Sequence, residues 1–207
     1  MLTKRFGHAS VVLKNETALI SGGYGVLDYS KPWPYWKTTE LFDGKQWTRG
    51  PDLPLKLFHH CMLLLDNGDI FMAGGYSGEA DVFDSFAPPS SATFIYSIDG
   101  EIWIRQPNMT LSAGGTSCAL YQGEVWVLSK SIEVFNLDTK TWRAGPEIPE
   151  TNLDTQQRER GGTIVSSNNE LIYAGGKHNF LEVISPFSID NSCMLLKGKR
   201  GKKNPEA

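Results

Sequence analysis

Short apolar runs alternate with turn residues along most of the chain. The runs 9–13 and 18–21 are joined by Lys14-Asn15-Glu16-Thr17, and the runs 61–65 and 70–73 are joined by Asp66-Asn67-Gly68-Asp69. Asn, Asp and Gly tolerate the positive φ angles that tight turns require, so each pair of runs predicts a β-hairpin. The runs are nearly continuous in apolar residues rather than strictly alternating, which indicates strands that are buried on both faces, as in stacked sheets.

The hairpin pattern recurs four times at nearly constant spacing. Each unit opens with two adjacent residues that are Gly or His. It closes with two adjacent glycines, except in the third unit, where Ser129-Lys130 takes their place. The intervals are 14 positions from His8 to Gly22, from His60 to Gly74 and from Gly115 to Ser129, and 13 from Gly162 to Gly175. Such regular self-similarity predicts a repeat architecture.

A second hairpin follows in three of the four units. Each has an apolar strand, a turn that contains Asp, and a tryptophan that enters the next strand; the tryptophans are Trp47, Trp103 and Trp142. Four strands per unit, at a spacing of roughly 50 residues, are typical of a propeller blade. The fourth unit has Glu182-Val183-Ile184 as its third strand but lacks the following turn and tryptophan.

The order of strand, Gly-Gly, variable loop, strand, Asp turn, Trp and Pro-x-x-Pro resembles kelch repeats. The predicted fold class is therefore all-β, with kelch-type β-propeller blades: three full four-stranded units plus a partial fourth. The propeller domain is expected at 5–190, with units at about 5–54, 57–109, 113–149 and 160–190. A closed four-bladed ring is the less favoured arrangement, because kelch propellers usually have more blades, so an incomplete propeller with open blade edges is expected.

Two sets of residues are predicted to be structural. The glycine pairs give a backbone path without Cβ atoms where neighbouring blades approach, and the three tryptophans fill the space between blades. The glycines are Gly22, Gly23, Gly74, Gly75, Gly175 and Gly176. The resemblance also implies that His8, His59 and His60, at the starts of first strands, hydrogen-bond the backbone of the next blade. No set of converging metal ligands can be assembled from them, so no cofactor is expected.

The candidate binding residues are aromatic and lie in two long loops. Because strands within a blade are antiparallel, the loops at 24–37 and 76–91 are expected on the same face, where a rigid scaffold commonly presents recognition residues. Aromatic side chains are frequent at interface hot spots. The predicted partner-binding residues are Tyr24, Tyr29, Trp33, Tyr35, Trp36, Tyr76, Phe83 and Phe86. The alternative is that these side chains fold against their own blades.

Composition changes this picture little. The net charge of the chain is −3. Residues 197–207 carry a charge of +4, so the remaining residues sum to −7. We expect a disordered basic tail there, with nuclear import as a second option, and no nucleic-acid-binding face elsewhere.

The chain contains no apolar run of the roughly 18 residues that a membrane span needs. Cys61, Cys118 and Cys193 show no C-x-x-C spacing, so we expect buried free thiols and a reducing, cytoplasmic compartment.

The expected function is a protein–protein interaction module that presents an aromatic loop face, as a substrate-recruiting or scaffold protein. The resemblance implies such roles, although the BTB-type domain that often accompanies kelch blades is absent from this sequence. Two alternatives stay open: a kelch-like enzyme (an oxidase or a sugar-modifying enzyme), and an incomplete fragment without function. Self-association through open blade edges is a further expectation.

Overall fold

The computed structural model describes residues 1–25, 34–78, 87–129 and 131–146, and three strands at 162–167, 170–175 and 180–184. Every regular element within these residues is a β-strand. No helix in this part of the chain is long and apolar enough to cross a membrane. The expected loop residues Tyr29, Trp33, Phe83 and Phe86, the glycine Gly176 and the basic tail lie outside the described residues.

The strands form four antiparallel sheets in chain order. Sheet 1 contains β1 (Ala9–Val12), β2 (Ala18–Ser21), β3 (Thr39–Phe42) and β4 (Trp47–Arg49). Sheet 2 contains β6 (Cys61–Leu64), β7 (Ile70–Ala73), β9 (Thr93–Ser97) and β10 (Ile102–Gln106). Sheet 3 contains β11 (Ser117–Tyr121), β12 (Glu124–Leu128), β13 (Ile132–Asn136) and β14 (Thr141–Ala144). Sheet 4 contains β15 (Gly162–Ser167), β16 (Glu170–Gly175) and β17 (Phe180–Ile184), and a small sheet joins β5 (Leu57–Phe58) to β8 (Tyr76–Ser77).

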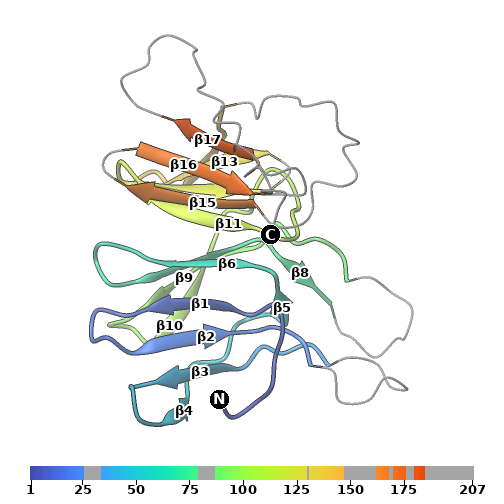
Figure 1. The fold of residues 1–207 in the computed structure, drawn as a ribbon, viewed down its shortest axis with the longest axis vertical. Coiled ribbons are helices and arrows are strands. Elements are labelled where there is room, and N and C mark those ends of the chain that lie inside the picture. The colour runs from blue at the N-terminus through green and yellow to red at the C-terminus, as the bar shows by residue number, and fades with distance from the viewer. Residues whose placement is uncertain are drawn as a thin grey trace, which may run out of the picture.

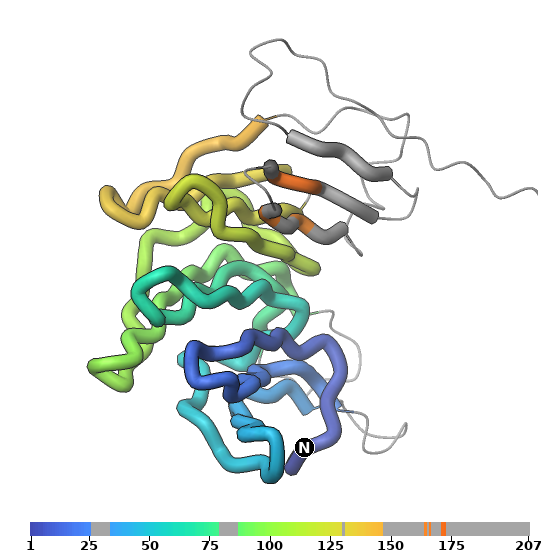
Figure 2. The backbone as a smooth tube through the Cα atoms, turned by 60° about the vertical axis from the view of Figure 1, so that its left-hand side comes forward, coloured from blue at the N-terminus to red at the C-terminus, as the bar shows by residue number. Residues whose placement is uncertain are grey.

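The sheets are arranged like propeller blades, one after another along the long axis of the molecule. Sheet 1 lies at one end and sheet 4 at the other in both views (Figures 1 and 2). This confirms the predicted fold class of three four-stranded units and a partial fourth. The ring of sheets is not closed, because sheets 1 and 4 lie at opposite ends. The predicted unit boundaries stay a prediction.

Apolar side chains fill the three junctions between successive sheets. Leu19 of sheet 1 packs with Met62 and Ile70 of sheet 2 in the first junction. Phe71 of sheet 2 packs with Phe135 of sheet 3 in the second, with ring centroids 5.5 Å apart. The third junction joins residues of sheet 3 to Ile164 and Leu171 of sheet 4. Both faces of sheets 2 and 3 are therefore buried, as their continuous apolar runs predict.

The glycine pairs stand where two sheets approach most closely. Gly22 has a φ of 63° and Gly75 a φ of 88°, a region that other residues rarely adopt. A Cβ on Gly22 would collide with the carbonyl oxygen of Leu57, and one on Gly75 would lie 2.8 Å from the carbonyl oxygen of Phe58. A side chain at position 22 would therefore push sheet 1 away from the segment that enters sheet 2, whereas one at position 75 would displace the segment that enters its own sheet.

The tryptophans occupy one register position in three sheets. Trp47 pairs with Phe42, Trp103 with Tyr96 and Trp142 with Phe135. Within each pair the ring centroids are 4.8, 5.1 and 5.0 Å apart, respectively. Trp103 packs against the clusters that join sheets 1 and 2, and Trp142 lies 6.3 Å from Phe71 of the preceding sheet. Trp47 has the same orientation on sheet 1, where the described residues include no preceding sheet.

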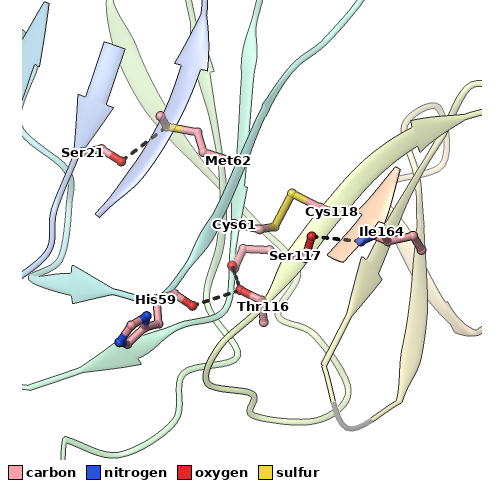
Figure 3. Close-up of a disulfide and its surroundings, with 9 residues drawn as sticks. Ser21, His59, Cys61, Met62, Thr116, Ser117, Cys118 and Ile164 are labelled. Atoms are coloured by element: carbon pink, nitrogen blue, oxygen red, sulfur yellow. Dashed lines mark hydrogen bonds between the residues drawn. A yellow bond between two sulfur atoms is a disulfide. The ribbon is translucent and has the colours of Figure 1, made fainter. Parts of the chain in front are cut away.

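The cysteine expectation is wrong: Cys61 and Cys118 form a disulfide (Figure 3). Cys61 lies on β6 and Cys118 on β11, with Cα atoms 5.7 Å apart, which is ordinary spacing for such a bond. The two residues are separated by 57 positions, and only the side-by-side placement of two first strands brings them together. The cysteines therefore no longer argue for a reducing, cytoplasmic compartment.

A repeated glutamate ties each of two sheets to the segment that enters it. The carboxylate of Glu40 on β3 accepts hydrogen bonds from the N–H groups of Leu2 and Thr3, at 2.6 and 2.9 Å. Glu133, at the same position on β13, accepts from the N–H groups of Thr110 and Leu111, at 2.7 and 3.1 Å. These carboxylates satisfy backbone donors beside the sheets, a role that the strand pattern alone does not reveal.

Glu40 has a buried cation in addition. The Arg5 guanidinium lies 2.6 Å from its carboxylate, and both side chains are almost completely buried. Burial is the largest influence on the pKa of Glu40 and acts to raise it. The N–H of Leu2, the guanidinium of Arg5 and the N–H of Thr3 together outweigh burial and hold the pKa of Glu40 below its ordinary value of 4.5.

Candidate binding site

Six rings gather at one edge of sheets 1 and 2, and we call this group the aromatic cluster. It consists of Phe6, Tyr24, Tyr35, Phe58, His59 and Tyr76. They come from the segment before β1, the two ends of the loop between β2 and β3, the strand β5 and the strand β8. None of the six lies on a strand of sheet 1 or sheet 2, so the segments that enter and connect the strands of these sheets set their positions.

Phe58 lies at the centre of the cluster. Its ring centroid is 4.8 Å from that of Tyr35, 5.3 Å from that of Tyr24 and 5.3 Å from that of Tyr76, on which it stacks. Phe6 lies at the margin, 6.0 Å from Tyr24, and is 58% exposed. Such offset and edge-on arrangements are favourable for aromatic pairs. The cluster is thus partly packed on itself and partly open to solvent.

Backbone hydrogen bonds hold the cluster in place. Phe6 and Tyr24 exchange N–H···O bonds of 2.8 and 2.9 Å, and Phe58 pairs with Tyr76 where β5 meets β8. Tyr24 also forms a bridge with Tyr35 across the base of the loop. Because these hydrogen bonds fix the backbone of the cluster residues themselves, little of their conformational entropy remains to be lost when a partner binds.

His59 connects the cluster to the junction between sheets 2 and 3. It has a φ of 52°, unusual for a non-glycine residue, and its N–H donates to the carbonyl of Gly7 at 2.7 Å. Its own carbonyl accepts a hydrogen bond from the N–H of Thr116 at 3.0 Å (Figure 3 shows the two residues side by side). Three sheets therefore meet at His59, whose imidazole is exposed beside Tyr24 and Tyr76.

The electrostatic character of the cluster is nearly neutral. Burial, and secondarily the neighbouring Tyr24, raises the pKa of the Tyr35 phenol, so this group stays protonated at physiological pH and can donate a hydrogen bond. Phenol O–H groups beside apolar rings suit partners that offer both an apolar surface and a hydrogen-bond acceptor.

The structure brings together three of the predicted partner-binding residues, Tyr24, Tyr35 and Tyr76. Trp36 takes a different position: the site of a Cβ on Gly25 lies 3.3 Å from its Nε1, which is buried without a hydrogen-bond partner among the described residues. The predicted residues Tyr29, Trp33, Phe83 and Phe86 fall in the segments 26–33 and 79–86, outside the description.

Sequence reasoning missed Phe6, Phe58 and His59 as members of the site. Phe6 stands in the segment Arg5-Phe6-Gly7-His8, which leads into β1 and lies outside the two long loops. Phe58 and His59 precede the first strand of sheet 2 and show no periodic pattern. The available signal was that aromatic residues recur at the entrance of a blade and after a glycine pair, since both places meet at one edge of the sheets.

His60 has a structural position that differs from the expected one. Its Nε2 lies 2.8 Å from the Oγ of Ser21, a side chain of the preceding sheet, instead of bonding to the backbone of the next blade. Burial first, and the charges of His59 and His8 second, lower the pKa of His60 from 6.5 to about 3. His60 is therefore neutral at physiological pH. Among the described residues, no group of three or more His, Cys, Asp or Glu is placed to hold a metal ion.

Comparison with known proteins supports the fold alone. No family model matches the chain. Among solved structures, 169 chains match. One of them, described as "Structure of YjhT", shares 14% sequence identity and a TM-score of 0.64 over 86% of this chain. The chain spans 66% of the length of that protein. The arrangement of antiparallel sheets as successive blades is thus a known protein architecture.

Proposed function

We propose that the chain is a recognition module built from kelch-type blades, which binds a protein partner through the aromatic cluster. The observation that carries this proposal is the convergence of Tyr24, Tyr35 and Tyr76 around Phe58 at one edge of a rigid frame. Large rings with few rotatable bonds are the side chains that contribute most at protein interfaces. Recruitment of a substrate or assembly of a scaffold fits such a surface.

The expected ligand is an extended protein segment with apolar side chains and exposed carbonyl groups. The apolar side chains would pack on Phe6 and Phe58, and a carbonyl would accept a hydrogen bond from the Tyr35 phenol. Unlike an ion or a small polar ligand, such a segment requires no concentrated charge in the site.

The test is selection of a displayed random-peptide library on the full chain, followed by calorimetry with the selected peptides. We expect Phe6→Ala and Tyr35→Ala to weaken binding by about tenfold each, the usual loss at an interface hot spot. Ile98→Ala is the matched control, because Ile98 is an apolar side chain that is 41% exposed and follows β9, outside the cluster. Peptides that bind equally well to both cluster variants would refute the proposal.

A further inference from the structure

Each sheet has two different flanks, and the chain shows how they fit together. We call the flank that faces the preceding sheet the leading flank, and the opposite one the trailing flank. On sheet 2 the leading flank carries Leu64, Tyr96 and Trp103, and on sheet 3 it carries Leu120, Phe135 and Trp142. Each of these flanks packs against the trailing flank of the preceding sheet.

Sheet 1 has a leading flank of the same design. Val12 pairs with Ala18, Ala18 with Phe42, and Phe42 with Trp47, in the same register as the leading flanks of sheets 2 and 3. Val12 is 62% exposed, and Phe42 and Trp47 are half-buried. No described residue of another sheet covers them. Met1 and Leu2, which are also exposed, extend this apolar surface.

The position of His8 also indicates that the described residues place no sheet before sheet 1. It stands where His60 and Thr116 stand in sheets 2 and 3, directly before the first strand. His60 contacts Ser21, and Thr116 donates to the carbonyl of Ala73 at 3.0 Å, each at the end of the second strand of the preceding sheet. His8 instead contacts Arg5 of the segment that enters its own sheet, and among the described residues it makes no such contact with a preceding sheet.

Sheet 4 presents the complementary surface. Leu171 faces sheet 3, so alternation along β16 places the half-buried Ile172 on the trailing flank. Sheets 1 and 4 lie at opposite ends of the molecule (Figure 1), so one copy does not bring its own two terminal flanks together.

We propose that the chain binds a second copy of itself head to tail, with the leading flank of sheet 1 of one copy on the trailing flank of sheet 4 of the other. This junction repeats the apolar contact that the molecule already makes three times between its own sheets. His8 of one copy then reaches the end of β16 of the other. A head-to-tail contact of this kind closes into a ring or continues as a chain of copies.

The experiment is analytical ultracentrifugation of the full chain over a wide range of concentrations. We expect assembly that grows with concentration, and Val12→Glu to weaken it by more than about tenfold, because a carboxylate would be buried in an apolar junction. Val12 is largely exposed within one copy, so this variant retains the fold. Ile98→Glu is the matched control and leaves assembly unchanged.

A mixing experiment identifies the two flanks. Val12→Glu blocks the leading flank of sheet 1, and Ile172→Glu blocks the trailing flank of sheet 4, so each variant alone stays monomeric. Their mixture retains one intact pair of flanks and forms dimers without larger species. A monomeric wild-type chain, assembly that persists in Val12→Glu, or a mixture that stays monomeric although circular dichroism shows both variants folded would each overturn the proposal. A monomeric wild-type chain would mean that other segments of the chain cover the flank.

Discussion

Sheets 1 and 3 are built on the same register, yet their environments differ. Phe135 and Trp142 of sheet 3 pack against Phe71 of the preceding sheet, and Phe135 is 0% exposed. Phe42 and Trp47 of sheet 1 contact each other at a similar ring separation, but the described residues place no sheet in front of them. The repeat thus determines which residues lie on the flank of each sheet, whereas the neighbouring sheet determines how much those residues contribute to stability.

The largest difference is expected for matched phenylalanine truncations. Phe135→Ala should lower the free energy of unfolding by about 3–5 kcal/mol, because it leaves a cavity between two sheets. Phe42→Ala should cost only about 1 kcal/mol, because its ring is already half in water. Urea unfolding of both variants measures the difference. Equal losses would show that the flank of sheet 1 is covered.

The disulfide between sheets 2 and 3 is expected to have the next largest effect. Cys61 and Cys118 close a loop with a separation of 57 residues, and such a cross-link typically stabilises a protein by about 2–4 kcal/mol. Dithiothreitol should lower the unfolding free energy of the wild-type chain by this amount. The double variant Cys61→Ser, Cys118→Ser is the control, since reductant should leave its stability unchanged; a response as large as that of the wild type would contradict the assignment.

The smallest of the three effects on stability is expected from the histidines that precede the first strands of sheets 1 and 2. The pKa of His60 is lowered from 6.5 to about 3 in the folded chain, so between these values the unfolded chain binds a proton that the folded chain does not. Stability is thus fully present above about pH 6.5 and falls with pH by up to about 1.4 kcal/mol per unit below it.

Variants at the two histidines separate this contribution from other acid effects. His60→Gln should flatten the dependence of the unfolding free energy between pH 6.5 and 5, because glutamine does not titrate. His8→Gln should change it in the same direction but less, because burial and the neighbouring Arg5 guanidinium lower the pKa of His8 without the complete burial of His60. An unchanged slope in His60→Gln would contradict the buried, neutral state of His60.

The strand order could be predicted from the sequence because each hairpin is local. The spacing from His8 to Gly22 and from His60 to Gly74 defines two strands and one turn, and the paired registers follow from it. The structural glycines were also accessible, since close backbone approach demands residues without a Cβ.

Contacts between units could not be predicted from the sequence in the same way. The Cys61–Cys118 bond depends on which faces of β6 and β11 meet, and the aromatic cluster depends on three segments that converge on Phe58. The pair of Arg5 and Glu40 joins the segment before β1 to the strand β3. Local periodicity predicts which residues are buried, but it does not specify their partners across a junction.

Hydroxyl-radical footprinting of the full chain tests the central claim most directly. The segments 39–49 and 132–144 carry the same Phe–Trp pair in the same register, but only the second has a described sheet in front of it. At high dilution, we expect Phe42 to be oxidised several times faster than Phe135. Equal oxidation of the two phenylalanines at every concentration would contradict a row of blades with an open flank on sheet 1.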